Sequence, residues 1–586
     1  MSGPVYFGRI MVKWCDECGV PVLGKRCDIC NNVPREMKIT PPGETRISFE
    51  GDLKRFDKIL DVYLKTHFSD LVRNYFVLLN RIPHDDRAEE VILHGETIFT
   101  VFYMDGKNHV SLRPKFYTLF REHIKGKWVI ADRGACGPIR EGKNLMWPGV
   151  KECSDDIEEN DDVFVLDENG ECIATGIFKK SETGHGVAVK IKHINDGREI
   201  KKVEADLDRA INANLNYLKN IEEKAVREIK KLDGKNVLVS FSGGKDSLVS
   251  LYLTILSGIR FRAFFLNTGL EFPETVDYVR KISIKYGIDM DIIDSGNSFF
   301  NALEHFGPPG RDYRWCCKVC KLGPTTRYLI DKGEVYVIIG QRKYESFTRY
   351  RNSNYWENEW VPNQKAFSPI QEWDSLSVWL YILFKKLEYN AWYERGMWRI
   401  GCYLCPSQDM GDFEIVREYN EKFSEWENYL YKYFRKYDNS EMMVSHGLWR
   451  WNKLPDHLKK KYGVGDIERE SLKTEVEFHE GKVLIKINKM PDEKRLKNML
   501  RILPEELYKK KENHIEADGS VYDKVLQIIY QAEECVGCGI CTGRCRYNAI
   551  ELRDNRAWIV EDLCMGCSAC LGPCPAFVFG GDHEQV

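Results

Sequence analysis

The chain has 586 residues, with 86 lysines and arginines against 89 aspartates and glutamates, and its formal net charge is -3. This length is too great for one hydrophobic core and predicts about three to five domains. The basic residues are spread along the chain and form no long tail, so any contact with nucleic acid must be local. No apolar run approaches the roughly 18 residues of a membrane span, so we expect no membrane association and a cytoplasmic, reducing location.

Two Cys-x-x-Cys pairs occupy residues 1–45, and eight residues lie between the pairs. Four thiols at this spacing suit a tetrahedral zinc site, and the alternative is a pair of disulfides. The sequence therefore predicts a zinc ribbon with the ligands Cys15, Cys18, Cys27 and Cys30. The ribbon ends in a Thr-Pro-Pro-Gly segment at 40–43, which is typical of a linker.

Residues 46–124 mix charged and aromatic residues and carry no motif that assigns them a role. Residues 125–197 contain short apolar runs at 162–166 and 186–191, which predict strands. Together with the segments 142–150 and 170–176, this region resembles a PUA domain. The resemblance implies a small barrel that binds RNA, although a barrel of this kind also arises without RNA binding.

Residues 198–232 are predicted to form one connecting helix, because apolar residues recur at steps of three and four. Its apolar face comprises Leu207, Ile211, Leu215, Leu218, Ile221, Ala225 and Ile229.

A glycine-containing turn follows the apolar run 237–241 and precedes the helical pattern 248–256. The turn consists of Ser242, Gly243, Gly244, Lys245, Asp246 and Ser247. Glycines let the backbone approach an anion closely, the first amides of a helix have no partner within it, and Lys245 adds positive charge. The turn is not a Walker A loop, because the spacing G-x-x-x-x-G-K-[ST] is absent. We therefore predict an anion-binding site.

With the segment 266–275, this turn resembles the PP-loop superfamily and, within it, the phosphoadenosine phosphosulfate (PAPS) reductase family. The resemblance spans roughly 230–410, and we assign the nucleotide domain to 233–410. In that family the turn holds a pyrophosphate, phosphate or sulfate. The segment that follows the next strand lines the adenosine site, so the resemblance implies this role for Asn267, Thr268 and Gly269. Strands that alternate with helices over this region also predict a parallel sheet flanked by helices, with the ligand at the carboxyl ends of the strands.

The segment 340–349 resembles the arginine-bearing substrate loop of the same family, and 368–373 resembles its later passage from strand to helix. The resemblance implies that Arg342 and Arg349 grip a phosphate or sulfate, as guanidinium groups do well. Lys245 and Asp246 are the expected catalytic residues. Lys245 would hold a phosphate, and Asp246 would orient the loop or a magnesium ion.

Five cysteines lie inside the nucleotide domain, as Cys316, Cys317, Cys320, Cys402 and Cys405. A Cys-Cys pair followed far downstream by Cys-x-x-Cys resembles the [4Fe-4S] site of the adenylyl sulfate (APS) reductase branch. The resemblance implies the ligands Cys316, Cys317, Cys402 and Cys405. Cys320 is then a surplus ligand or a reactive catalytic cysteine. The Glu-Cys-Gly-x-His segment that carries the nucleophile of those reductases is missing from this chain.

Residues 411–525 are predicted to form a helical, aromatic-rich part and a small α/β part, without an assigned role. Residues 526–586 contain two runs with the cysteine spacing of two-cluster bacterial ferredoxins. Because the fourth cysteine of each run serves the other cluster, one [4Fe-4S] is expected on Cys535, Cys538, Cys541 and Cys574, and the second on Cys564, Cys567, Cys570 and Cys545. Arg546 stands where proline is usual in the first run. The remaining cysteines, Cys136, Cys153 and Cys172, are expected to be structural.

The predicted fold is thus a multidomain α/β protein with a zinc ribbon, a PUA-like barrel, a parallel-sheet nucleotide domain and a ferredoxin domain. Its expected partners are an adenine nucleotide (ATP, APS or PAPS), tRNA or rRNA, and an electron donor. We favour ATP-dependent thiolation of RNA, since the glycine turn is intact, the terminal nucleophile is missing and the barrel resembles an RNA reader. The alternative is reduction of APS or PAPS to sulfite with electrons from the ferredoxin domain. A third class is an RNA-binding electron carrier without nucleotide chemistry.

Overall fold

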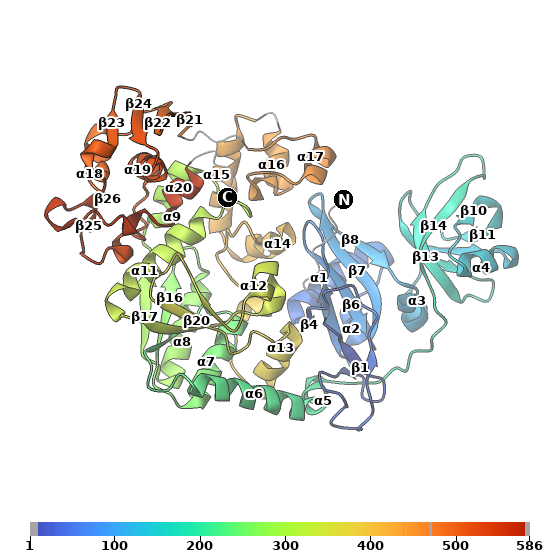
Figure 1. Ribbon diagram of the computed structural model, residues 1–586. Coiled ribbons are helices and arrows are strands. Elements are labelled where there is room, and N and C mark those ends of the chain that lie inside the picture. The colour runs from blue at the N-terminus through green and yellow to red at the C-terminus, as the bar shows by residue number, and fades with distance from the viewer. Residues whose placement is uncertain (1–9, 438, 468–471, 581–586) are drawn as a thin grey trace.

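The computed structural model describes residues 10–437, 439–467 and 472–580. Figure 1 shows the N-terminal sheet in the middle of the molecule, between the nucleotide domain on one side and a separate small β-rich lobe on the other. The cysteine-rich C-terminal part lies at the far end of the nucleotide domain. The predicted multidomain α/β class is confirmed.

The N-terminal ribbon is a small antiparallel sheet in the order β2-β1-β3. Its strands are β1 (Lys13–Cys15), β2 (Val20–Pro21) and β3 (Arg35–Glu36). Trp14, in β1, is almost completely buried and lies against Gly95 of the next domain. The ribbon is therefore packed onto the N-terminal sheet.

Residues 45–120 form a five-stranded antiparallel sheet whose strands follow chain order. The strands are β4 (Thr45–Ile47), β5 (Val77–Arg81), β6 (Ala88–Leu93), β7 (Glu96–Met104) and β8 (Lys107–Leu112), and the helices are α1 (Glu50–Leu64), α2 (Phe68–Val72) and α3 (Pro114–Phe120). Phe56, Phe68 and Phe99 meet edge to face in the core between α1, α2 and β7. This domain had no counterpart among the elements expected from the sequence.

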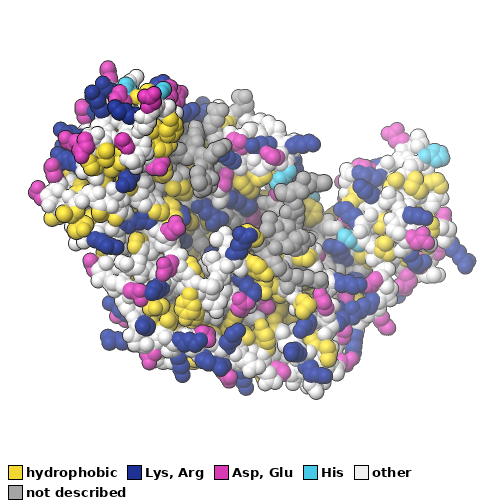
Figure 2. Space-filling model, in the orientation of Figure 1, with side chains coloured by type: hydrophobic (Ala, Val, Ile, Leu, Met, Phe, Trp, Pro, Cys, Tyr) yellow, Lys and Arg dark blue, Asp and Glu magenta, His cyan; other side chains and the backbone are white. Residues whose placement is uncertain are grey.

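The small β-rich lobe is a six-stranded sheet in the order β10-β14-β13-β12-β9-β11. Its elements are β9 (Trp128–Ala131), α4 (Arg133–Arg140), β10 (Leu145–Met146), β11 (Val150–Cys153), β12 (Asp162–Leu166), β13 (Cys172–Phe178) and β14 (Val187–Ile194). The Tyr63 hydroxyl of α1 donates to the carbonyl of Asp162 and accepts from its amide, which joins the lobe to the N-terminal sheet. On the face shown in Figure 2, acidic and basic side chains are interspersed over this lobe.

The connecting segment contains two helices, α5 (Leu207–Asn212) and α6 (Leu215–Lys230), so the expectation of one continuous helix was wrong. Asn214 separates them, and its side chain is used for contacts with the ribbon. Its amide nitrogen donates to the carbonyls of Pro21 and Ala210, and its amide oxygen accepts from the backbone amide of Leu23 at 2.6 Å. Asparagine often interrupts a helix, because its side chain competes with the helical hydrogen bonds for backbone groups.

The nucleotide domain is a six-stranded sheet in the order β17-β16-β15-β18-β20-β19. Its strands are β15 (Val237–Ser240), β16 (Arg262–Asn267), β17 (Met290–Asp294), β18 (Val335–Ile339), β19 (Tyr355–Glu357) and β20 (Gln364–Phe367), and its helices are α7 (Lys245–Ser257), α8 (Pro273–Tyr286), α9 (Ser298–Phe306), α10 (Trp315–Cys317), α11 (Gly323–Leu329), α12 (Phe347–Arg351) and α13 (Ser375–Phe384). All pairs are parallel except the edge pair β19–β20. The strand order reverses between β15 and β18, which is where open sheets of this kind bind ligands.

The C-terminal third begins with α14 (Met410–Tyr419), α15 (Lys422–Phe434), α16 (Ser440–Ser445) and α17 (Asp456–Tyr462). A four-stranded antiparallel sheet follows, in the order β21-β22-β24-β23. It contains β21 (Thr474–His479), β22 (Lys482–Ile487), β23 (Tyr508–Lys510) and β24 (His514–Asp518), with α18 (Glu493–Leu500) and α19 (Tyr522–Glu534). The last elements are β25 (Ile550–Arg553), β26 (Arg556–Ile559) and α20 (Pro575–Phe579). Among the described residues, no helix combines the length and apolar character that crossing a membrane needs.

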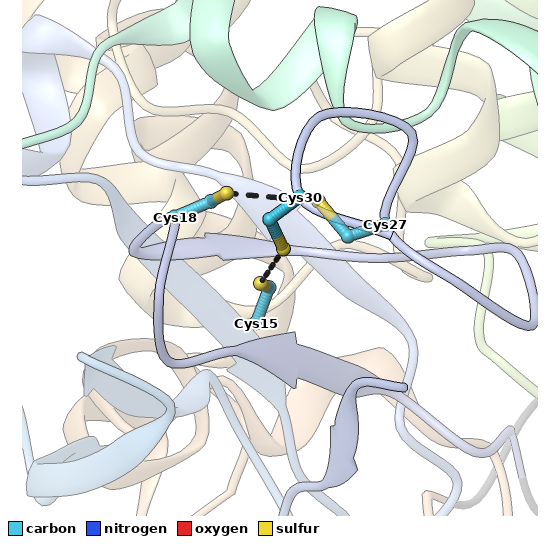
Figure 3. A group of neighbouring side chains, drawn as sticks. All are labelled: Cys15, Cys18, Cys27 and Cys30. Atoms are coloured by element: carbon cyan, nitrogen blue, oxygen red, sulfur yellow. Dashed lines mark hydrogen bonds between the residues drawn. The ribbon is translucent and has the colours of Figure 1, made fainter. Parts of the chain in front are cut away.

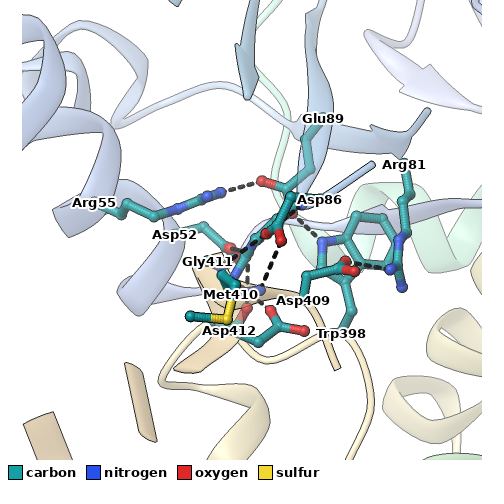
Figure 4. A network of polar contacts seen from close by, with 12 residues as sticks. Asp52, Arg55, Arg81, Asp86, Glu89, Trp398, Asp409, Met410, Gly411 and Asp412 are labelled. Atoms are coloured by element: carbon teal, nitrogen blue, oxygen red, sulfur yellow. Dashed lines mark hydrogen bonds and ion pairs between the residues drawn. The ribbon is translucent and has the colours of Figure 1, made fainter. Parts of the chain in front are cut away.

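A buried ionic network joins the N-terminal sheet to the segment 396–412, which follows the nucleotide sheet (Figure 4). Arg87 contacts Asp52, Glu89 and Asp412 at 3.3, 2.9 and 3.0 Å, and all four side chains are at most 2% exposed. Although burial raises the pKa of Glu89, the charges of Arg55 and Arg87 outweigh it and hold that pKa well below its usual range. The segment that carries Cys402 and Cys405 is therefore anchored against the N-terminal domain.

Candidate functional site

The glycine turn connects β15 to α7, at the point where the strand order reverses. Gly243 has φ +77, and a side chain there would lie 2.8 Å from the Thr275 methyl group. Gly340, after β18, is equally constrained, because a Cβ would lie 2.4 Å from the amide of Ser247. Gly244 is the N-cap of α7, so the helix begins at Lys245, whose amide donates to the Tyr393 hydroxyl at 2.9 Å. The turn thus has the geometry of an anion-binding helix start.

The charged residues of the turn form a buried chain. Lys245 Nζ lies 2.6 Å from Asp246 Oδ2, and Asp246 Oδ1 lies 2.6 Å from Arg342 Nε. Although burial raises the pKa of Asp246, the positive charges of Arg342 and Lys245 outweigh it and lower that pKa to about 2. Both carboxylate oxygens are thus engaged by the protein. Arg349 pairs with Glu345, whose carboxylate also accepts from the amide of Arg342.

A cavity of about 320 Å³ extends from this turn to the internal cysteines. Of the residues expected at the nucleotide site, six line the cavity: Ser242, Gly244, Asp246, Ser247, Thr268 and Arg349. Lys245 and Arg342 are almost completely buried and lie behind this lining. Gly243, Asn267 and Gly269 also lie outside the lining. Thr268, which belongs to the expected adenosine site, also reaches the cysteine end, since its hydroxyl contacts the Cys402 Sγ at 3.7 Å.

The other end of the cavity is lined by the five cysteines at positions 316, 317, 320, 402 and 405. A hydrogen bond with Cys316 lowers the pKa of Cys317 to about 5, and Lys321 and Arg314 act in the same direction. Cys320 differs from the others. It is 2% exposed and packs into the apolar core, whereas the other four are partly exposed; burial raises its pKa, as it raises that of Cys402 to about 12. The arrangement therefore separates four partly exposed thiols from one buried thiol.

Four such thiolates are a suitable donor set for a [4Fe-4S] cluster. Cys316, Cys317, Cys402 and Cys405 come from α10 and from the loop before α14, and they meet only because the chain folds back on itself. Cys320 lines the cavity but is the one buried thiol of the five, which argues against the expectation that it is a catalytic nucleophile.

The eight C-terminal cysteines influence one another mainly within the two expected sets, although Cys541 is also influenced by Cys570 of the other set. Burial raises the pKa of Cys541, and repulsion from Cys535, Cys538 and Cys574 adds to the rise. In the other group, burial raises the pKa of Cys570 to about 12, and Cys545, Cys564 and Cys567 contribute in the same way. The crossed assignment of the fourth cysteine in each run, which two [4Fe-4S] clusters require, stays a prediction.

The C-terminal region packs directly on the nucleotide domain through α11. Arg327 donates to the carbonyl of Cys538, and a Cβ on Gly323 would lie only 2.4 Å from the same carbonyl oxygen. Gly323 stands three residues after Cys320, which is about 4.5 Å of helix rise. Cys538 and Cys320 belong to one apolar core. The first C-terminal cysteine group is therefore adjacent to the wall of the nucleotide cavity.

The four N-terminal cysteines form a compact site (Figure 3). All four Sγ atoms lie within 4.8 Å of one another, and the Sγ atoms of Cys15 and Cys30 are 3.4 Å apart. Thiolates around a tetrahedral Zn²⁺ lie about 2.3 Å from the metal, so a set this compact fits zinc. Burial raises the pKa of Cys18 to about 11, which zinc binding would overcome by favouring the thiolate.

Several residues of the site had no assigned role in the sequence interpretation. The Tyr393 hydroxyl accepts from the amide of Lys245 at 2.9 Å, and Glu44 pairs with Arg342. Lys321 and Gln408 line the cysteine end of the cavity. Lys321 and Gln408 are within three residues of a cysteine in the internal set, and this proximity was the available signal. Glu44 and Tyr393 have no such signal, because only the fold brings them to the turn.

Two protein families match parts of the chain. The family described as "Phosphoadenosine phosphosulfate reductase domain" matches residues 236–408, and the family described as "PUA domain" matches residues 127–194. The PUA match covers the small β-rich lobe, and the other match covers the parallel sheet with its cavity.

Two relatives match most of the chain, and both are named as uncharacterized proteins of Methanocaldococcus jannaschii. MJ0066 is 35% identical over 76% of this chain and 97% of its own length, and MJ0973 is 33% identical over 69% and 94%. An adenosine 5'-phosphosulfate reductase of Geobacillus kaustophilus is 29% identical over 31% of this chain and 79% of its own length. Among solved structures, a PAPS reductase of Candida auris in a phosphate complex covers 32% of this chain and 94% of its own, with 20% identity and a TM-score of 0.26.

Proposed function

The chain belongs to the same family as the uncharacterized proteins MJ0066 and MJ0973 and joins a PAPS reductase domain to a PUA domain, and from this premise we propose that it catalyses ATP-dependent thiolation of RNA. One observation carries the proposal. A single cavity joins the glycine turn to four partly exposed cysteines, in a chain that also holds a PUA domain.

The nucleotide end of the cavity would activate the RNA. Amides of the glycine turn would hold phosphate oxygens of ATP, with Lys245 adding positive charge from behind the cavity lining, while a carbonyl oxygen of a base attacks the α-phosphorus and pyrophosphate leaves. Asp246 would orient the turn, because its two oxygens already bind Lys245 and Arg342. This favours the loop-orienting role of Asp246 over the alternative role as a magnesium ligand.

Sulfur would enter at the cysteine end. A sulfur nucleophile attacks the activated carbon, the carbon–oxygen bond to AMP breaks, and AMP leaves with the former carbonyl oxygen. If the sulfur arrives as hydrosulfide, this exchange is redox-neutral. If it arrives as a persulfide, two electrons and a proton are needed to cleave the sulfur–sulfur bond. An electron supply close to the cavity would therefore serve the second case.

The internal and C-terminal cysteines are the residues that would hold iron–sulfur clusters. Clusters on the internal set and on the two C-terminal sets would supply one-electron steps. The role of the protein is to pack the C-terminal region against α11 through Gly323 and Arg327 and so bring it to the cavity wall. The N-terminal zinc site would fix the ribbon, and the PUA lobe would bind the RNA.

This same packing favours a second candidate, the reduction of APS or PAPS. There a thiolate attacks the sulfate sulfur, AMP or phosphoadenosine phosphate leaves, and two electrons release sulfite from the S-sulfocysteine. An electron-transfer region against the cavity wall suits that chemistry directly. The burial of Cys320, the one internal thiol outside the expected cluster set, is the observation against it.

The two candidates differ in what they consume. Anaerobic full-length protein should be incubated with ATP, tRNA or rRNA, a sulfur donor and a reductant, and assayed for AMP, pyrophosphate and thiolated nucleosides by mass spectrometry. We expect AMP release that depends on RNA and disappears in Lys245→Ala. Release of sulfite from APS or PAPS without RNA, and no RNA-dependent AMP, would replace the proposal by the second candidate.

A further inference from the structure

A glutamine with an unusual environment lies at the cysteine end of the cavity. Gln408 follows Cys405 by three residues and lines the cavity, although its side chain is only 3% exposed. The cavity wall around it also contains Ser407 and Leu404. A polar side chain this deeply buried normally hydrogen-bonds with the protein.

The backbone of Gln408 is held firmly in place. Its amide donates to the carbonyl of Cys405 at 2.9 Å, and its carbonyl accepts from Arg450 at 2.8 Å and from Arg311 at 3.2 Å. The next residue, Asp409, is itself paired with Arg311. The position of the side chain is therefore fixed by the same contacts that anchor the cysteine loop.

The side chain itself has no partner among the described residues. Neither Oε1 nor Nε2 of Gln408 finds a hydrogen-bond partner there, and the buried Oγ of Ser407 also lacks one. Burying a donor and an acceptor without partners destabilises the folded protein. A ligand that supplies both a donor and an acceptor would remove this penalty when it binds.

The chemistry of a carboxamide limits what that ligand can be. Sulfate and phosphate oxygens can accept from Nε2, but a fully ionised oxyanion has no proton to donate to Oε1. The edge of a nucleobase presents a donor beside an acceptor, and glutamine binds such an edge with two parallel hydrogen bonds. A base also has to leave its stack before an enzyme can react with one of its atoms.

We propose that Gln408, assisted by Ser407, binds the donor–acceptor edge of an unstacked nucleobase at the cysteine end of the cavity. This inference rests on the proposed function and names the part of the RNA that the site holds. All four bases present such an edge, but adenine has no carbonyl that sulfur could replace, and we take the pyrimidines, which are smaller than guanine, as the bases bound. Uracil offers N3–H beside a carbonyl, cytosine offers its amino group beside N3, and both carry a carbonyl that can be activated and replaced by sulfur.

Nucleoside binding tests the inference without turnover. Anaerobic full-length protein, saturated with a non-hydrolysable ATP analogue, should be titrated with uridine, cytidine, adenosine and 3-methyluridine by ligand-observed NMR. We expect uridine or cytidine to bind. If uridine is the ligand, 3-methyluridine, whose N3 donor is blocked, should bind at least tenfold more weakly. Gln408→Met keeps the side-chain length and should weaken the preferred nucleoside at least tenfold, with the affinity for the ATP analogue unchanged within twofold.

Two further variants keep the test decisive. Gln408→Glu retains the shape, replaces the Nε2 donor by an acceptor, and should weaken the same nucleoside even if the methionine variant folds poorly. Asn420→Leu removes another amide nitrogen without a partner among the described residues, at the end of α14 and outside the cavity lining, and should leave binding unchanged.

The outcomes separate the inference from the function it builds on. Unchanged nucleoside binding in Gln408→Met, or no nucleoside binding by the parent protein, would overturn the inference. A loss of affinity for the ATP analogue instead would assign Gln408 to the adenine and also overturn it. If the parent protein binds a pyrimidine nucleoside but releases no RNA-dependent AMP, the base site stands and the proposed reaction fails.

Discussion

Glu44 and Arg342 form a buried ion pair, with Glu44 Oε2 2.9 Å from Arg342 Nη1, although 298 positions separate them in the chain. The same guanidinium binds Asp246 of the glycine turn through Nε. The segment between the ribbon and β4 therefore reaches the nucleotide site. Arg342, expected from the sequence to grip a phosphate or sulfate, is instead shared between two carboxylates in the described structure.

Glu44→Gln should raise the affinity for ATP, because the substitution removes a negative charge that offsets Arg342 beside the anion site. We expect an increase of roughly three- to tenfold at low ionic strength, measured by isothermal titration calorimetry. Glu372→Gln is the matched control, since its carboxylate pairs with Lys343 and is 54% exposed. Weaker ATP binding in Glu44→Gln would mean that Glu44 holds Arg342 in a position that binding needs.

Lys245→Ala and Asp246→Ala should each lower turnover by roughly a hundredfold or more, because each removes a charge that positions or stabilises phosphate groups. The C-terminal cysteine groups lie in another domain, so the iron content and visible absorption should not change. The exposed Lys235, just before β15, provides the control Lys235→Ala. Turnover at the parent rate in either site variant would make the turn purely structural.

Gly323→Ala should loosen the packing of the C-terminal region, because the added methyl carbon would lie 2.4 Å from the carbonyl oxygen of Cys538. We expect turnover that depends on an external electron donor to fall roughly tenfold, while ATP affinity stays unchanged. Gly137→Ala, in α4, has open space for its methyl group and serves as the control. Parent-like, donor-dependent turnover would show that this contact does not matter for electron supply.

Metal analysis of anaerobically purified protein should find about one zinc and about twelve irons, the latter as three [4Fe-4S] clusters. Replacing Cys402 and Cys405 together by serine should remove about four irons and leave zinc unchanged. Mössbauer and electron paramagnetic resonance spectra would identify the remaining clusters. About eight irons in both the parent and this variant would remove the internal cluster from the site.

Asp162 should make the docking of the PUA lobe dependent on pH. Burial raises its pKa to about 6, above the value near 3.8 of the unfolded chain. Between pH 3.8 and pH 6 the carboxyl group is therefore protonated in the folded state and ionised in the unfolded state. Stability is therefore unaffected below pH 3.8, falls as pH rises to 6, and is lowered by at most about 3 kcal/mol above that.

Asp162→Asn should consequently raise the melting temperature at pH 7.5, where the carboxylate is charged, and should have little effect near pH 4, as both forms are then neutral. Scanning calorimetry at the two pH values measures the difference. An asparagine variant that is less stable at pH 7.5 and unchanged near pH 4 would show that the pair with Lys192, 3.8 Å away, outweighs the cost of burial.

The parts of the fold that the sequence predicts well are those where a local motif determines the backbone. The turn after β15 needs glycine, and the cysteine runs need fixed spacing, so both are readable from neighbouring residues. The N-terminal sheet is different. Every residue of β6 is buried, including Glu89 and Glu90, so the strand lacks the alternation of inward and outward residues on which strand prediction depends.

The candidate site divides in the same way. The internal cysteines are visible as a pattern, whereas Glu44, Tyr393 and Gln408 enter the site through contacts between distant segments. The break between α5 and α6 is a further case. The apolar period continues through it, but the contacts of Asn214 with the ribbon outweigh the preference for one helix.

The ionic network of Figure 4 limits how this nucleotide domain could be exchanged between proteins. Asp409 and Asp412 follow the cysteine loop and are neutralised by Arg81 and Arg87 of the N-terminal sheet. A gene fragment that began at 198 would lose Arg81 and Arg87, so Asp409 would keep only Arg311 and the buried Asp412 would lose its counter-ion, which is strongly destabilising. Recombination within this family is therefore expected to carry the N-terminal sheet and the cysteine loop together, or to replace both aspartates at once.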